Sequence, residues 1–260
     1  MEDDHPEPLG QSTPDPQGEH PRGGIRSMAS RLDAARRRPA GRRALAVVAG
    51  LMVLAGIALI AYPFATDIYT ERVLQVQLER KLTRPEARTA YVTRTVRAGD
   101  PLTRIVIPDL EVDAVVVEGT SMAALRAGAG HYPSTPLPGE DGNVAIAGHR
   151  TTYGRPFARL DELAVGAEVR LVTPVATHVY RVVSAPSDAD RPCPSGACWI
   201  TGPRDWGVVE SMPGSVLTLT TCHPKGSDRE RLILRAELVK TVERPLQPAG
   251  SAGSDEADQT

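Results

Sequence analysis

Cys222 is the residue whose surroundings best suit it to chemistry. It ends the run 217–222 (Leu-Thr-Leu-Thr-Thr-Cys), in which alternation with period two places Thr218, Thr220 and Cys222 on one face of the expected strand. A substrate can reach a thiol that lies at the end of a core strand and is followed by a polar turn. The alternative is a buried structural cysteine, and Cys222 alone would favour that alternative.

His149 and Arg231 could supply the two groups that a nucleophilic cysteine needs. His149 follows the apolar run 144–147, and an imidazole can accept a thiol proton or hold the thiolate as an ion pair. Arg231 opens a later β-type run, and a fixed guanidinium can stabilise the negative charge that develops during acyl transfer. The alternatives are a surface-loop histidine and a solvated arginine, because the chain has six histidines and other arginines lie near Arg231.

Short β-type runs separated by turns fill the chain from about residue 91 to about residue 242. Several of them alternate apolar and polar residues, as half-buried strands do. About seven short strands in so compact a region predict a mostly β domain, either a small closed barrel or a sandwich. One helix is expected at 121–127 and a turn or helix at 156–163. The candidate strands are 104–108, 112–117, 143–147, 169–173, 178–183, 216–221 and 232–239.

An uncharged apolar segment at 44–65 precedes this domain. As a helix it would span roughly 33 Å, which is enough to cross a membrane once. The alternatives are a buried core helix and a cleaved signal peptide, although a signal peptide is usually shorter and nearer the N-terminus. Five arginines lie in 36–43, so the positive-inside rule predicts a cytoplasmic N-terminus and an extracellular catalytic domain.

Three further parts complete the predicted organisation. Residues 1–43 and 243–260 are polar and rich in Pro and Gly, a composition that predicts a disordered cytoplasmic tail and a disordered C-terminal tail. Residues 66–90 mix apolar and charged side chains and predict a short helical extracellular stalk. The formal net charge is −2 and the pI is about 6.3, which gives no electrostatic reason to expect a nucleic-acid partner.

The motifs around the three candidate residues resemble those of sortases. The run 218–222 (Thr-Leu-Thr-Thr-Cys) resembles the Thr-Leu-x-Thr-Cys signature of that family, and 148–150 (Gly-His-Arg) resembles its histidine motif. Arg231 at the start of the next strand completes the family's His–Cys–Arg order. The resemblance covers about 91–242 and implies a closed eight-stranded β-barrel with one or two short helices, in which the Cys and Arg strands are neighbours.

The resemblance also implies an activity and its partners. Cys222 would attack the Thr–Gly bond of a C-terminal sorting signal on a secreted protein and form a thioacyl enzyme, with Thr220 and Thr221 beside it as candidate substrate-binding residues. An amine, usually that of the peptidoglycan precursor lipid II, would then release the product. We expect no cofactor, because thiolate, imidazole and guanidinium suffice. We expect no metal site either, because no carboxylate cluster with suitable spacing is present.

Two stretches are similar to class E sortases of high-GC actinobacteria: 149–154 (His-Arg-Thr-Thr-Tyr-Gly) and 222–225 (Cys-His-Pro-Lys). That class prefers a Leu-Ala-x-Thr-Gly signal over Leu-Pro-x-Thr-Gly, and the tyrosine that corresponds to Tyr153 is tied to the preference. An ordinary half-buried tyrosine is the alternative. Class D or F sortases, with a Leu-Pro-x-Thr-Gly preference, are the nearest alternative within the family.

The other two cysteines, Cys193 and Cys198, lie in one Pro- and Gly-containing loop. Outside the membrane such a close pair is expected to form a local disulfide. Free thiols are the alternative, and a zinc site would need two more ligands at suitable spacing. We hypothesise that the disulfide stiffens one wall of the substrate groove. It would leave Cys222 as the one free thiol, since three cysteines are an odd number.

Other functions predict different patterns. An L,D-transpeptidase carries a Ser-His-Gly-Cys type motif with His and Cys close in sequence, whereas His149 and Cys222 are far apart. A cysteine protease would transfer its acyl group to water. A membrane-anchored, non-enzymatic β-barrel binding module predicts that Cys222 is unreactive.

Overall fold

The computed structural model describes residues 39–244, and the chain divides into two compact units after Ile57. The predicted disordered tails at 1–43 and 243–260 lie almost entirely outside the described residues. Helix α2 (Pro39–Tyr69) begins a few residues before the predicted membrane segment. Arg42 and Arg43, which precede that segment, are good helix formers and lie within the helix.

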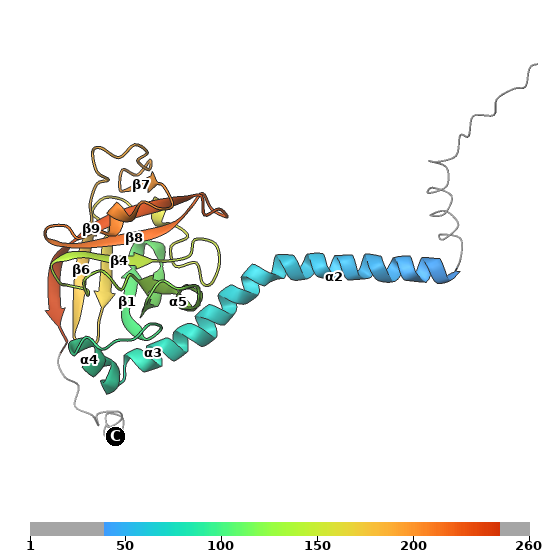
Figure 1. Ribbon diagram of the computed structural model, residues 1–260, viewed down its shortest axis with the longest axis horizontal. Helices are drawn as coiled ribbons and strands as arrows, with labels where there is room; N and C mark the ends of the chain where they lie inside the picture. Colours follow the sequence, from blue (N-terminus) through green and yellow to red (C-terminus); the bar gives the residue numbers. More distant parts are fainter. Residues whose placement is uncertain (1–38, 245–260) are drawn as a thin grey trace, which may run out of the picture. The chain divides into compact units, whose positions relative to one another are not determined.

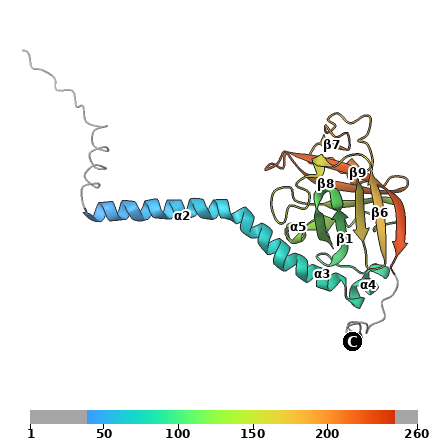
Figure 2. The same ribbon diagram turned by 180° about the vertical axis from the view of Figure 1, so that it is seen from behind.

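The second unit is built on one β-sheet that closes on itself (Figures 1 and 2). Eight strands form the ring in the order β6-β5-β1-β2-β3-β4-β8-β9, and β9 pairs back with β6. This confirms the predicted eight-stranded barrel; a ninth strand, β7, is added along β9. The strands are β1 (Pro101–Ile107), β2 (Val112–Glu118), β3 (Ala129–His131), β4 (Gly142–Ala147), β5 (Glu168–Val172), β6 (Ala176–Val182), β7 (Cys198–Thr201), β8 (Ser215–His223) and β9 (Glu230–Glu243).

Strands β4 and β8 form the part of the barrel that carries the candidate site. They run parallel, and every residue of β4 is buried, as is 216–221 of β8. Leu217 and Leu219 of β8 face the interior core, so the Thr218, Thr220 and Cys222 side chains lie on the other face, as the alternation predicts. Burial of each leucine contributes roughly 1.5–3 kcal/mol relative to its exposure, which fixes the register of β8.

The predicted helix at 121–127 is present as α5 (Met122–Ala127), with the Ser121 hydroxyl accepting a hydrogen bond from the Ala124 N–H at 3.2 Å. The predicted turn or helix at 156–163 contains one 3₁₀ turn, η3 (Leu160–Glu162). The other 3₁₀ turns are η2 (Pro108–Leu110) and η4 (Trp206–Val209).

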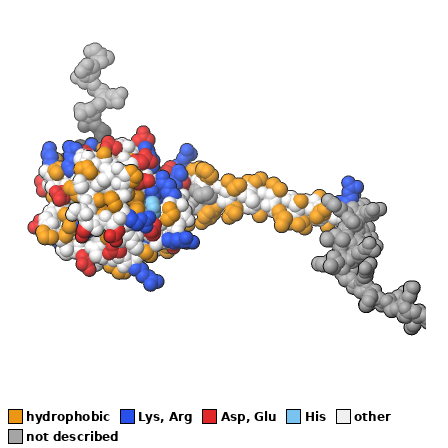
Figure 3. Space-filling model, turned by 90° about the horizontal axis from the view of Figure 1, so that it is seen from above, with side chains coloured by type: hydrophobic (Ala, Val, Ile, Leu, Met, Phe, Trp, Pro, Cys, Tyr) orange, Lys and Arg blue, Asp and Glu red, His pale blue; other side chains and the backbone are white. Residues whose placement is uncertain are grey.

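Helix α2 contains the stretch Gly41–Tyr62, which is long and apolar enough to cross a membrane. Its large apolar side chains are exposed from Leu45 to Phe64, and Figure 3 shows hydrophobic side chains along the helix. The overlap with 44–65 agrees with the predicted single span. The helical path continues as a π-helical turn η1 (Thr70–Gln75), α3 (Val76–Leu82) and, after a break, α4 (Pro85–Val92).

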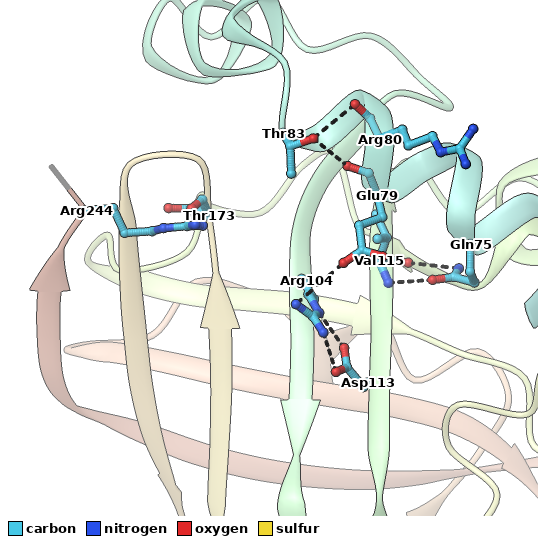
Figure 4. Close-up of polar contacts among 9 residues, drawn as sticks. All are labelled: Gln75, Glu79, Arg80, Thr83, Arg104, Asp113, Val115, Thr173 and Arg244. Carbon is cyan, nitrogen blue, oxygen red and sulfur yellow. Dashed lines mark hydrogen bonds and ion pairs between the residues drawn. The ribbon is translucent and has the colours of Figure 1, made fainter. Parts of the chain in front are cut away.

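Residues 70–82 pack directly on the outside of the barrel. Leu78 and Leu82 form a small apolar cluster with Val115 and Val117 of β2. Gln75 donates to the carbonyl of Ala127 at 2.6 Å and accepts the Val115 N–H at 2.6 Å. Figure 4 shows Gln75 and Glu79 reaching to Val115 and Arg104; the Glu79–Arg104 ion pair is 3.6 Å long. The segment after the candidate membrane span is therefore attached to the barrel by specific side chains.

Candidate active site

Two of the three predicted catalytic residues are directly paired, and the third follows the neighbouring strand β4 by two residues. Cys222 in β8 is paired directly with Arg231 in β9, and side chains of such pairs lie on the same face with Cβ atoms about 4.5–5.5 Å apart. On the other side of β8, Ala147 pairs with Thr220 in parallel at the end of β4, and His149 follows two residues later. The Gly148 N–H donates to the Thr220 carbonyl at 3.0 Å, which extends the pairing in that direction.

Cys222 is half-buried, and it is the one free cysteine, since all three cysteines lie in the part of the chain that the structure describes. Its neighbour Thr221 is buried and donates its hydroxyl to the Gly148 carbonyl at 2.7 Å. This bond ties the strand of the cysteine to the residue before His149. A reagent can reach the thiol while the backbone on both sides of it is fixed.

His149 is half-buried, and its Nε2 atom has no hydrogen-bond partner among residues 39–244. Burial lowers the pKa of His149, and the positive charge of Arg126 on α5 lowers it further. The neutral imidazole is therefore the favoured form, and a neutral imidazole can accept a proton from a thiol.

Arg231 is partly exposed and is held by the backbone of its own turn. Its Nη1 donates to the carbonyls of Asp228 at 2.8 Å and Glu230 at 2.9 Å. Within 39–244 these are the hydrogen bonds of the Arg231 side chain. A guanidinium carries five N–H donors. Donors therefore remain for a carbonyl oxygen bound beside Cys222.

Arg150 also belongs to the site, a role that the sequence interpretation missed. Its side chain is 4% exposed and donates to the Cys222 carbonyl at 3.3 Å and to Nδ1 of His223 at 2.8 Å. Asp161 neutralises it across 2.9 Å. Burial, and then the charge of Arg150, lower the pKa of His223, which is consistent with a neutral ring that accepts this bond. The place of Arg150 in the Gly-His-Arg motif is the signal that could have found it.

The three predicted substrate-binding residues have different surroundings. The Tyr153 ring lies 5.2 Å from the His149 ring, and the Arg126 guanidinium lies 5.9 Å from the tyrosine ring. Thr220 is buried and shares a 3.1 Å hydrogen bond with the Tyr132 hydroxyl. The hydroxyls of Thr220 and Thr221 are thus engaged inside the protein, whereas Tyr153 is half-buried beside the imidazole.

Cys193 and Cys198 form a disulfide with a Cα–Cα distance of 5.2 Å. Both are buried in the main core, and the Cys193 N–H donates to the Cys198 carbonyl at 2.7 Å. The bridge closes the loop that leads into β7, whose Thr201 pairs with Arg231. The loop is therefore connected to the candidate site through β7.

No group of three His, Cys, Asp or Glu side chains in 39–244 could hold a metal ion.

A cavity of about 780 Å³ adjoins the site. It lies between η1, the start of β2 and the loop after His149, and it has charged groups of both signs in its lining. Its lining includes Arg150, Tyr153, Gly154, Arg155 and Lys225.

The comparison with protein families matches the Sortase domain to residues 105–239. The match includes strands β4 and β8 and all three predicted catalytic residues. The chain therefore belongs to the sortase family, whose members are cysteine transpeptidases.

Class E sortases are among its relatives. The chain is 30% identical over 154 residues to Sortase SrtE1 of Streptomyces coelicolor, which covers 54% of this chain and 40% of the relative. It is 29% identical over 119 residues to Sortase D of Bacillus subtilis, covering 45% of this chain and 52% of the relative. The chain thus spans about half the length of the curated relatives it matches.

Solved structures give a similar result. The SrtF sortase from Corynebacterium diphtheriae is 31% identical with a TM-score of 0.52, over 60% of this chain and 93% of that one. A Sortase D5 transpeptidase from Clostridium perfringens is 26% identical with a TM-score of 0.53, over 66% and 99% of the two chains.

Proposed function

We propose that this chain is a membrane-anchored sortase in which Cys222 is the nucleophile, His149 the proton carrier and Arg231 the group that binds the developing oxyanion. The observation that carries the proposal is the direct pairing of Cys222 with Arg231, with the histidine loop bonded along the other edge of β8. The sortase relatives support the same assignment.

In the first half of the proposed reaction, His149 accepts the Cys222 proton and the sulfur attacks the threonine carbonyl of a sorting signal. A C–S bond forms, and the carbonyl oxygen becomes negative beside the Arg231 guanidinium. The C–N bond to glycine then breaks, and the imidazolium returns the proton to the leaving amine. A thioester on Cys222 remains.

In the second half, an amine of a cell-wall precursor of the lipid II type attacks the thioester. The new amide bond forms as the C–S bond breaks, His149 takes the proton from the amine, and Cys222 regains a thiol proton. Water performing the same attack would give hydrolysis, so transfer depends on an amine reaching the thioester first.

Two signal preferences are open to this site. The relationship to SrtE1 and the position of Tyr153 beside His149 support a Leu-Ala-x-Thr-Gly signal. The likeness to the SrtF and Sortase D5 structures supports the second candidate, a class D or F type enzyme that prefers Leu-Pro-x-Thr-Gly.

We further propose that Gly41–Tyr62 is a single-pass anchor with a cytoplasmic N-terminus, a catalytic domain of about 91–242 outside the cell, and secreted proteins as substrates. The arginines before the helix support this orientation. Residues 66–90 would connect the anchor to the catalytic domain.

Peptide turnover tests the proposed function. The full chain in detergent is incubated with fluorogenic Leu-Ala-x-Thr-Gly and Leu-Pro-x-Thr-Gly peptides and an amine acceptor, beside Cys222→Ala. We expect cleavage after Thr and an amine-capped product by mass spectrometry, with neither in the variant. Turnover of neither peptide, together with an unreactive Cys222, would favour a non-enzymatic binding module.

A further inference from the structure

The loop that follows His149 has an unusual backbone. Three successive residues adopt positive φ angles: Tyr153 at 55°, Gly154 at 75° and Arg155 at 43°. This left-handed region is uncommon for residues other than glycine, and strain of this kind persists only where the surroundings hold it.

A carboxylate from the helix outside the barrel holds this loop. Asp67 Oδ1 accepts the Gly154 N–H at 2.9 Å, and Oδ2 pairs with Nε of Arg155 at 2.8 Å. The Asp67 side chain is only 9% exposed. Hydrogen bonds to a largely buried carboxylate are among the stronger ones in proteins, so Asp67 holds two of the three left-handed residues at once.

The same loop closes over His149. The Phe157 N–H donates to the His149 carbonyl at 3.2 Å. The Phe157 ring also packs against Gly148, where a Cβ would lie 2.5 Å from the ring. The backbone before His149 therefore cannot move toward the Phe157 ring. Tyr153 contacts the imidazole from the other part of the loop, and its hydroxyl is 3.3 Å from that of Tyr62. Displacing 153–155 would therefore remove one wall of the His149 pocket.

We propose that Asp67 is a positioning residue for His149, so that the helix leaving the membrane span completes the active site. The inference rests on the proposed function for its catalytic meaning. Asp67 lies five residues after Tyr62, the last residue of the candidate span. The carboxylate does not reach the reacting atoms; it acts through the loop that carries Tyr153.

The test uses the full chain in detergent with Asp67→Ala and Asp67→Asn. Asp67→Ala removes both contacts, whereas Asp67→Asn keeps an oxygen for the Gly154 N–H and loses the ion pair with Arg155. We expect kcat/KM to fall by about tenfold to a hundredfold for Asp67→Ala, as for other small misplacements of catalytic groups, and by less for Asp67→Asn. The matched control is Glu79→Gln on α3, which removes a different carboxylate contact with the barrel and should leave kcat/KM near wild type.

The second readout is the pH dependence of Cys222 alkylation by iodoacetamide, which needs no peptide turnover. The titratable and charged groups that act on His149 are Tyr153 from its own loop and Arg126 from α5. Loss of Asp67 should loosen the loop and expose the imidazole. Because burial lowers the pKa of His149, exposure should raise that pKa and shift the acid limb of the alkylation profile to higher pH. A residue that only stabilised the fold would lower Tm without moving this limb.

The outcomes separate the two proposals. Activity in wild type with an Asp67→Ala rate and alkylation profile equal to those of Glu79→Gln would overturn the positioning role and leave the proposed function standing. Absence of turnover in wild type would overturn the proposed function, and the alkylation profiles would still decide the role of Asp67. If Asp67→Ala does not fold, the near-isosteric Asp67→Asn decides both measurements.

Discussion

Cys222 and Arg231 are directly paired residues of two antiparallel strands, so the thiol and the guanidinium project from the same face of the sheet. A shift of one residue in either strand would turn one of them to the opposite face. The buried leucines of β8 and β9 hold this register, with Leu219 paired to Leu234 in the core. The geometry of the site thus depends on barrel packing as well as on the residues themselves.

Removing the guanidinium should slow the acyl-transfer step. We expect Arg231→Ala to lower kcat/KM about 10²–10³-fold, the range seen when an oxyanion-binding donor is lost. Arg231→Lys should recover part of the rate, because an ammonium supplies the charge without the planar fork. Steady-state kinetics on the preferred peptide measures both. Arg229→Ala, in the same turn, is the control; an equal loss there would show that the effect is one of general charge.

The acid limb of kcat/KM should report His149. Burial, with a further contribution from Arg126, lowers the pKa of this imidazole, and the proposed mechanism needs its neutral form. Activity should therefore fall only as pH drops below the ordinary histidine value of about 6.5. Arg126→Gln removes the smaller cause and should move the limb upward. His223→Gln should leave it in place; a limb that followed His223 would contradict the assignment.

Tyr153 should affect which signal is preferred. Tyr153→Asn removes the ring beside His149 while tolerating the left-handed backbone at this position. We expect the ratio of kcat/KM for the Leu-Ala and Leu-Pro peptides to move toward one. Tyr153→Phe keeps the ring and should keep most of the preference. An unchanged ratio in Tyr153→Asn would remove this residue from the recognition of the signal.

The disulfide should contribute to stability and, through β7, to activity. Closing so short a loop is worth about 2 kcal/mol in the chain-entropy view. The Cys193→Ser, Cys198→Ser double variant should therefore show a lower Tm and a reduced kcat/KM, because β7 pairs with β9 at Arg231. Differential scanning calorimetry and peptide kinetics test this prediction. If Tm and rate both stay at wild-type values, the bridge has no role in stiffening the groove.

The parts of the fold that the sequence predicts well are those with local patterns. The alternation in 217–222, the apolar run before His149 and the charge-free segment at 44–65 each reflect a periodicity or a composition. Strands β3 and β7 were missed because they are only three and four residues long. Strands this short show no detectable alternation in the sequence. Their pairing with neighbouring strands is what identifies them.

The contacts missed at the site are long-range and polar. Arg150 bonds to a residue 72 positions away, and Asp67 to one 87 positions away. A single buried carboxylate or guanidinium in a loop or helix leaves no repeating pattern in the sequence. Gln75, which contacts β2 and α5, lies in the π-helical turn. Residue preferences do not predict such a turn.

The central claim is that Cys222 forms the covalent intermediate, and intact-protein mass spectrometry tests it most directly. The full chain in detergent is incubated with the preferred sorting peptide without an amine acceptor, quenched in acid, and digested to locate the adduct. We expect an added mass equal to the peptide through its threonine, on Cys222, released by hydroxylamine and absent in Cys222→Ala. Peptide cleavage that persists in Cys222→Ala, or an adduct on another residue, would contradict the account.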